Sequence, residues 1–107
     1  MILRIEVAEQ ANIAFPESRI DSVSATSFQD QLVELIGRSD NVVVDCADVE
    51  YVSSAGLRAL LVAAKSAQTK GVKFAVCSLK SHVKEIFTVS GFDNMVQIHP
   101  DRETALA

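Results

Sequence analysis

The sequence predicts an α/β fold with a mixed sheet. Segments of strand-like and helix-like periodicity alternate along most of the 107 residues, which is typical of parallel strands joined by right-handed crossovers. The first two strand-like segments are instead separated only by a short polar turn, which favours an antiparallel hairpin at one edge of the sheet. The chain contains no internal repeat and no linker, so we expect one domain over residues 1–107 with about four helices.

The hairpin is expected at the N-terminus. Apolar and charged residues alternate over residues 3–7, the period of two that is typical of a half-buried strand. After a polar turn, residues 13–15 give a second short strand that Pro16 ends. Residues 17–22 are interpreted as a loop that leads to the first helix.

That helix is predicted to begin at Ser22 or Ser24, either of which suits an N-cap, and to end at Gly37. Its apolar residues share one face, namely Phe28, Leu32, Leu35 and Ile36. Residues 41–45 contain a β-branched run that is apolar enough for a strand buried on both faces. The following residues, 46–51, are interpreted as a loop.

The longest amphipathic helix is expected after residue 53, with apolar residues at helical spacing until Gly71, a typical helix end. Beyond it we predict a strand over 72–77, a helix over 80–90 with Val83, Ile86 and Phe87 inward, a strand over 95–98 and a last helical turn or two over 101–106. Gly91 ends the third helix, and Phe92 is placed to fold back onto its last turn.

Residues 52–57 join the strand region to the longest helix, so Ser53 and Ser54 are expected at the N-terminal end of that helix. Unpaired backbone N–H groups and the positive pole of the helix dipole favour an anion or a capping hydroxyl there. One interpretation is that a serine simply caps the helix. The other is a contact surface, because two serines, Ala55 and Gly56 together let another molecule's backbone or a phosphate come close.

Composition and charge argue against several function classes. The net charge is −4 and the lysines are scattered, so nucleic acid is not expected as a partner. No stretch reaches the 18 apolar residues of a membrane span, and the first residues lack the pattern of a signal peptide. We therefore expect a cytoplasmic protein without direct membrane insertion.

The sequence also lacks the residue patterns of common active sites. Cys46 and Cys77 are too few and too far apart for a zinc motif or a disulfide framework, and we expect two small thiols that are buried or half-buried. His82 and His99 pair with no acid at a recognisable spacing, and the hydrolase motif Gly-x-Ser-x-Gly fails because Val52 replaces its first glycine. No catalytic residue, no metal site and no cofactor are therefore expected.

Residues 42–61, VVVDCADVEYVSSAGLRALL, resemble the signature of STAS domains, specifically the single-domain anti-sigma-factor antagonists. The similarity extends over nearly the whole chain. Residues 20–21 resemble the family's Leu-Asp before the first helix, residues 70–72 its glycine turn, and residues 89–92 the ending of its third helix. The resemblance implies a STAS-like fold and a binding module rather than an enzyme.

In that family, the unphosphorylated antagonist binds an anti-sigma factor that is also a serine kinase of the histidine-kinase-like ATPase type, which frees a sigma factor for transcription. The kinase phosphorylates the antagonist in an Asp-Ser-Ser/Thr-Gly motif, and a PP2C-type phosphatase reverses this partner switching. By resemblance the phosphoacceptor is Ser54, with Ser53 as the alternative. The implied partner-binding residues are Asp21, Ser53, Ser54, Ala55, Gly56 and Leu57.

The chain departs from the family's pattern at three positions. Ser53 stands where the family usually has aspartate, which leaves a second hydroxyl beside the acceptor; Ala55 stands where Ser or Thr is frequent, and Ser18 where many members have glycine. Asp21 has an alternative role as an acid at the start of a helix. Because some STAS domains are never phosphorylated, a subunit of a transport or scaffolding complex remains the alternative function.

Overall fold

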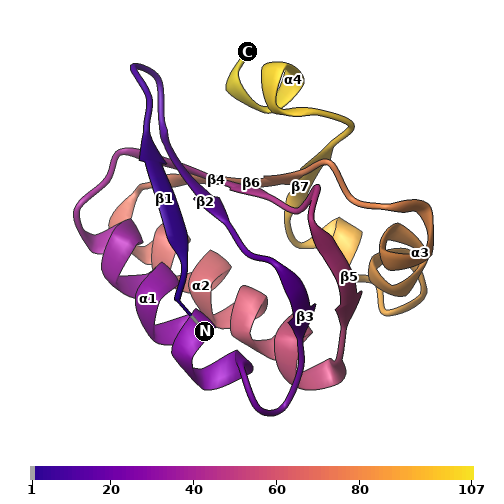
Figure 1. The fold of residues 1–107 in the computed structure, drawn as a ribbon. Coiled ribbons are helices and arrows are strands. Elements are labelled where there is room, and N and C mark those ends of the chain that lie inside the picture. The colour runs from indigo at the N-terminus through magenta and orange to yellow at the C-terminus, as the bar shows by residue number, and fades with distance from the viewer. Residues whose placement is uncertain (1) are drawn as a thin grey trace.

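The computed structural model describes residues 2–107. The strands are β1 (Arg4–Val7), β2 (Asn12–Phe15), β3 (Ser18–Ile20), β4 (Asn41–Asp45), β5 (Val49–Val52), β6 (Lys73–Cys77) and β7 (Gln97–His99). The helices are α1 (Ala25–Gly37), α2 (Ser54–Lys70), α3 (Ser81–Val89) and α4 (Arg102–Leu106), with a 3-10 turn, η1 (Phe92–Asn94). The predicted α/β class with four helices is confirmed (Figure 1).

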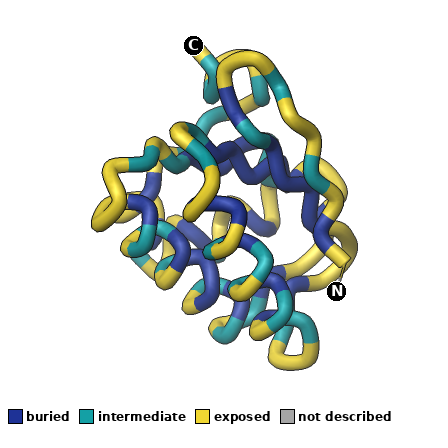
Figure 2. Tube along the Cα trace, turned by 90° about the vertical axis from the view of Figure 1, so that its left-hand side faces the viewer, coloured by how far each residue is buried: buried dark blue, intermediate teal, exposed yellow. Residues whose placement is uncertain are grey.

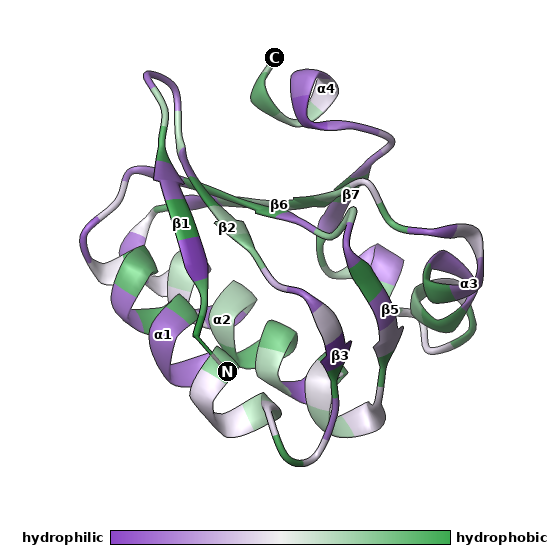
Figure 3. Ribbon diagram, viewed as in Figure 1, coloured by the Kyte–Doolittle hydropathy of each residue, from purple (hydrophilic) through white to green (hydrophobic). Residues whose placement is uncertain are grey.

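The main sheet has five strands in the order β1-β2-β4-β6-β7. β1 and β2 form the predicted antiparallel hairpin at one edge, and the other neighbouring strands pair in parallel. In Figure 3 the hydropathy of β1 alternates, whereas β6 is apolar along most of its length. Despite this alternation, Ile5 is only partly buried in the core. Val7 is 78% exposed, because the end of this edge strand lies beyond the helices.

The sheet has two unequal faces. α1 and α2 pack side by side on one face, against Val42 and Val44, while the short α4 lies over the other (Figure 1). Val43 points to the α4 side, together with Phe15 and Cys77. The central strand β4 is therefore buried on both faces, as predicted, and the buried residues form the interior of the trace in Figure 2.

The predicted helix boundaries hold within a few residues. All four apolar residues predicted for the inner face of α1 are fully buried, and its N-cap is Ser24. α2 ends at Gly71, whose φ of 70° is the left-handed conformation that glycine adopts easily. Phe92 folds back onto Phe87 with ring centroids 5.2 Å apart, but Ile86, predicted to point inward, is only half-buried.

Two segments predicted as loops are strands. Residues 17–22 contain β3 and residues 46–51 contain most of β5, and the two pair in parallel as a separate small sheet. The burial of β5 follows no period of two, because only Val49 and Val52 at its ends are buried. This pairing depends on contacts between distant segments, such as the 2.9 Å hydrogen bond from the Ser18 amide to the Asp48 carbonyl.

Within residues 2–107, no helix combines the length and the apolar character that crossing a membrane requires. Cys46 and Cys77 are free thiols and both are buried, Cys46 in the main core and Cys77 in the smaller cluster beneath α4. Burial raises the pKa of both thiols, since an apolar environment penalises the thiolate.

Candidate functional site

The small sheet brings the predicted site residues together. Ile20, the last residue of β3, pairs with Val52, the last residue of β5, so the two parallel strands end side by side. Asp21 directly follows β3 and Ser53 directly follows β5. The Ser53 amide donates a 2.9 Å hydrogen bond to the Ile20 carbonyl, which joins the two strand ends at the starts of α1 and α2.

The two serines have different roles at the start of α2. Ser53 is the N-cap: it has extended backbone angles, and its hydroxyl accepts a 3.2 Å hydrogen bond from the Gly56 amide. Ser54 is the first residue of the helix and is exposed, and its hydroxyl makes no hydrogen bond within residues 2–107. The capping role proposed for one serine is therefore taken by Ser53, which leaves the Ser54 hydroxyl available to a second molecule.

Gly56 lies where the backbone of β3 passes closest to α2. A Cβ atom at this position would lie 2.4 Å from the Ile20 carbonyl oxygen and 2.9 Å from a methyl carbon of Val52. Such distances are far below van der Waals contact, so any side chain at position 56 would push the helix away from the strand ends. Gly56 is itself buried, so its role is to let the first turn of α2 pack against the strand ends.

Ala55 and Leu57 are half-buried and pack against the main core. They hold the first turn of α2 in place and present only part of their surface to solvent. Of the predicted partner-binding residues, Ser54 is the exposed one, whereas the others are half-buried or buried.

Asp21 stabilises the turn that leads into α1. One of its carboxylate oxygens accepts hydrogen bonds from the backbone amides of Val23 and Ser24, at 3.0 and 3.3 Å. These amides, together with the neighbouring guanidinium of Arg19, hold the pKa of Asp21 below its usual value, since they favour the ionised form. The carboxylate therefore stays charged beside the start of α2.

Three further residues border the site and were not among the predicted site residues. The Arg19 guanidinium lies 4.5 Å from the centre of the Tyr51 ring and 3.4 Å from the Asp21 carboxylate, across the outer surface of the small sheet. Val23 is 89% exposed in the turn before α1. The sequence contains a signal for Val23, an apolar residue within the polar run at 21–24 and outside the helical pattern. It contains none for Arg19 and Tyr51, because no local pattern predicts the two short strands that carry them.

The described residues 2–107 contain no group of three or more histidine, cysteine, aspartate or glutamate side chains placed to hold a metal ion. His82 contacts the Glu50 carbonyl oxygen at 2.7 Å, and His99 lies 3.4 Å from the side-chain oxygen of Gln97. In this part of the chain neither imidazole is hydrogen-bonded to a serine or a carboxylate.

Comparison with known proteins identifies relatives of this chain. The family model described as STAS domain matches residues 3–105. BtrV of Bordetella bronchiseptica, a protein named as an anti-sigma factor antagonist, is 32% identical over all of this chain and 93% of its own length.

Solved structures share the fold at lower sequence identity. TM1081 of Thermotoga maritima has a TM-score of 0.89 at 19% identity, over 96% of this chain and 90% of its own. The anti-sigma factor antagonist SpoIIAA in its unphosphorylated form has a TM-score of 0.79 at 11% identity, over 97% of this chain and 92% of its own. These similarities extend over nearly the full length of each chain.

Proposed function

We propose that this chain, which belongs to the STAS domain family, is an anti-sigma-factor antagonist whose binding to an anti-sigma factor is switched off by phosphorylation of Ser54. Proteins of this kind bind partners and catalyse no reaction, so the chemistry belongs to the partner. The partner we propose is an anti-sigma factor that is also a serine kinase of the histidine-kinase-like ATPase type. A PP2C-type phosphatase would restore the binding form, and the output would be the regulation of transcription.

The difference between the two serines carries this proposal. A phosphoacceptor hydroxyl must reach the kinase without breaking the fold, and the hydroxyl of the exposed Ser54 makes no hydrogen bond within residues 2–107. Ser53 is half-buried and is engaged as the N-cap of α2. Phosphorylation of Ser53 would modify the hydroxyl that caps α2 and so disrupt the N-cap, whereas phosphorylation of Ser54 would leave the N-cap in place.

Phosphorylation would change the surface and leave the fold intact. The Ser54 oxygen attacks the γ-phosphorus of ATP held by the kinase, ADP leaves, and a base of the kinase takes the hydroxyl proton. The new phosphate adds about −1.5 to −2 charges at the N-terminus of α2, where the helix dipole favours negative charge. A partner docked on Ser54 would meet added bulk and charge, and a thousandfold loss of affinity requires only about 4 kcal/mol.

The first prediction concerns the charge at position 54. Ser54→Asp should weaken binding to the anti-sigma factor by at least about tenfold, because a carboxylate imitates part of the phosphate charge. Binding is measured by titration calorimetry with the anti-sigma factor kinase encoded in the same genome, beside the gene if one lies there. The melting temperature should stay within a few degrees of wild type, since surface changes rarely cost more than about 0.5 kcal/mol.

Ser81→Asp is the matched control, because Ser81 is likewise an exposed first residue of a helix, α3. It adds the same charge at the same helical position and should bind like wild type. Equal affinities of the two variants would show that the contact surface lies elsewhere.

The modification itself is tested by intact and tandem mass spectrometry of the protein purified from its own cells, with and without phosphatase treatment. A phosphate on Ser54 supports the switch. A phosphate on Ser53 would refute the assignment of the acceptor. Unmodified serines under many growth conditions would favour a constitutive subunit of a transport or scaffolding complex.

A further inference from the structure

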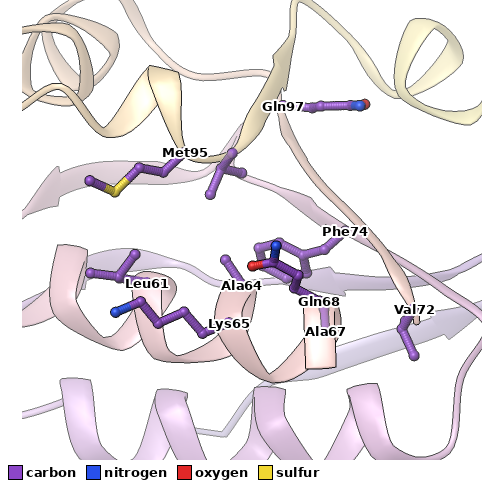
Figure 4. Close-up of a pocket in the computed structure, with 10 residues that line it drawn as sticks. Leu61, Ala64, Lys65, Ala67, Gln68, Val72, Phe74, Met95 and Gln97 are labelled. Atoms are coloured by element: carbon purple, nitrogen blue, oxygen red, sulfur yellow. The ribbon is translucent and has the colours of Figure 1, made fainter. Parts of the chain in front are cut away.

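A cavity of about 500 Å³ lies between the C-terminal half of α2 and the strands β6 and β7 (Figure 4). It is separate from the serine site, because the residues of α2 that line it begin at Leu61, seven residues after Ser54. Its volume falls in the range of roughly 300–1,000 Å³ that is usual for small-molecule sites. The proposed switch at Ser54 gives this cavity no role.

The walls of the cavity are mainly apolar. Leu61 and Ala64 come from α2, Phe74 from β6, and Met95 and Val96 from the segment before β7. Figure 4 shows Met95 above Leu61, on the opposite wall. Phe74 is only half-buried and Met95 is 62% exposed, so this apolar surface has no cover within the described residues 2–107. An apolar ligand would remove this surface from water, which is favourable in proportion to its area.

The polar groups of the cavity favour a negative charge. Lys65 is the one charged residue among its lining residues, and its ammonium forms no ion pair within residues 2–107. Lys80, in contrast, is paired with Glu50. Gln68 is the nearest other polar side chain, and its amide can donate a hydrogen bond, whereas the side chain of Gln97 contacts His99 and points away from Lys65 in Figure 4. One cation and one amide suit a single carboxylate.

We propose that this cavity binds a medium-chain carboxylate, with its hydrocarbon chain between Leu61, Phe74 and Met95 and its carboxylate on Lys65. Met95 suits such a wall, since its unbranched thioether side chain adapts to different apolar shapes. The charge sets the orientation of the ligand: the carboxylate lies at the exposed rim with Lys65, and the chain lies inward against Phe74.

Decanoate is the probe, titrated below its micelle concentration into the full-length protein and followed by ¹H–¹⁵N NMR. We expect saturable shifts confined to the amides around the cavity, chiefly in the C-terminal half of α2, in β6 and in residues 95–97. Lys65→Glu should weaken binding by at least about tenfold. Lys70→Glu is the matched control, since Lys70 is an exposed lysine of the same helix outside the cavity, and its dissociation constant should stay within about twofold.

Decyltrimethylammonium has the same hydrocarbon chain and the opposite charge, so it tests the role of Lys65 by changing the charge of the ligand instead of the protein. Binding as tight as that of decanoate, or equal effects of the two lysine variants, would overturn the proposal. Shifts spread over the whole surface would do the same. Retention of wild-type spectra by Lys65→Glu in the absence of decanoate shows that the fold is intact, so a loss of binding then supports the carboxylate site.

Discussion

At the scale of single residues, the site depends on the close approach of Gly56 in α2 to the Ile20 carbonyl at the end of β3. The Ile20 carbonyl oxygen accepts the Ser53 amide and occupies the space that a side chain at position 56 would need. Only glycine lets α2 begin so close to the end of β3. Because Ser54 is carried on this first helical turn, its position relative to Asp21 depends on the same contact.

We expect Gly56→Ala to destabilise the domain by about 2 kcal/mol or more, since a methyl group 2.4 Å from a backbone oxygen forces the helix or the strand to move. Urea unfolding followed by circular dichroism measures the change. Gly37→Ala is the control: it also replaces a helical glycine, but its Cβ would meet only the Lys70 ammonium at 3.4 Å, so stability should be unchanged or rise by up to about 1 kcal/mol. Similar losses in both variants would contradict the close approach.

The different roles of Ser53 as N-cap and Ser54 as candidate acceptor also belong to the scale of single residues. The sequence alone does not decide which serine has which role. Both hydroxyls suit a cap or an acceptor, and a shift of one residue in the start of the helix would exchange their roles. The structure distinguishes them by the bond from the Gly56 amide to Ser53.

At the scale of elements, α4 is the least supported helix. It is five residues long and is fixed by Arg102, whose guanidinium lies 3.4 Å from the buried Asp45 carboxylate, 3.7 Å from Glu6 and 5.2 Å from the centre of the Phe15 ring. Ala105 and Leu106 add apolar contacts to the same face of the sheet. One side chain therefore links the last helix to three strands.

Arg102→Ala should loosen α4 and lower the free energy of unfolding by about 1–2 kcal/mol, as expected for charge-assisted contacts that are partly exposed. Hydrogen exchange should accelerate in α4 and remain slow in β4. Glu103→Ala, on the exposed side of the same helix, forms no ion pair within residues 2–107 and should have little effect. Unchanged exchange in α4 of the arginine variant would show that its apolar contacts suffice.

Sequence patterns predicted the elements that bury a regular face and missed those that do not. α1 and α2 were predicted because their apolar residues recur at helical spacing, and β4 because its apolar run is continuous. β3 has three residues and a backbone irregularity after Ser18, whose φ of 60° lies in the left-handed region that favours glycine. So short a strand is stabilised by its pairing with β5, and no pattern within residues 18–20 predicts that pairing.

At the scale of the whole molecule, β4 lies at the centre of a sheet covered from both sides. Val43 is fully buried between β2 and β6 and faces α4, while its neighbours Val42 and Val44 face α1 and α2. The edge position of the hairpin was predicted because chain connectivity leaves few alternatives. The second, smaller sheet was not predicted, although it positions the candidate site.

Val43→Asp should abolish cooperative folding, because a buried carboxylate without a partner costs several kcal/mol in a domain of marginal stability. Thermal denaturation followed by circular dichroism tests this. Val89→Asp introduces the same group at a residue that is 81% exposed and should melt within a few degrees of wild type. A soluble Val43→Asp variant with a normal melting transition would contradict the central position of β4.

The placement of the two cysteines has a consequence for covalent labelling. Cys46 packs in the main core, whereas Cys77 packs in the smaller cluster beneath α4, so the two thiols are covered by different parts of the molecule. Each buried thiol reacts only when the part of the structure that shields it from solvent opens. A maleimide reagent would therefore record two separate events, the departure of α4 at Cys77 and the opening of the main core at Cys46, as two rates in a single mass-spectrometric time course.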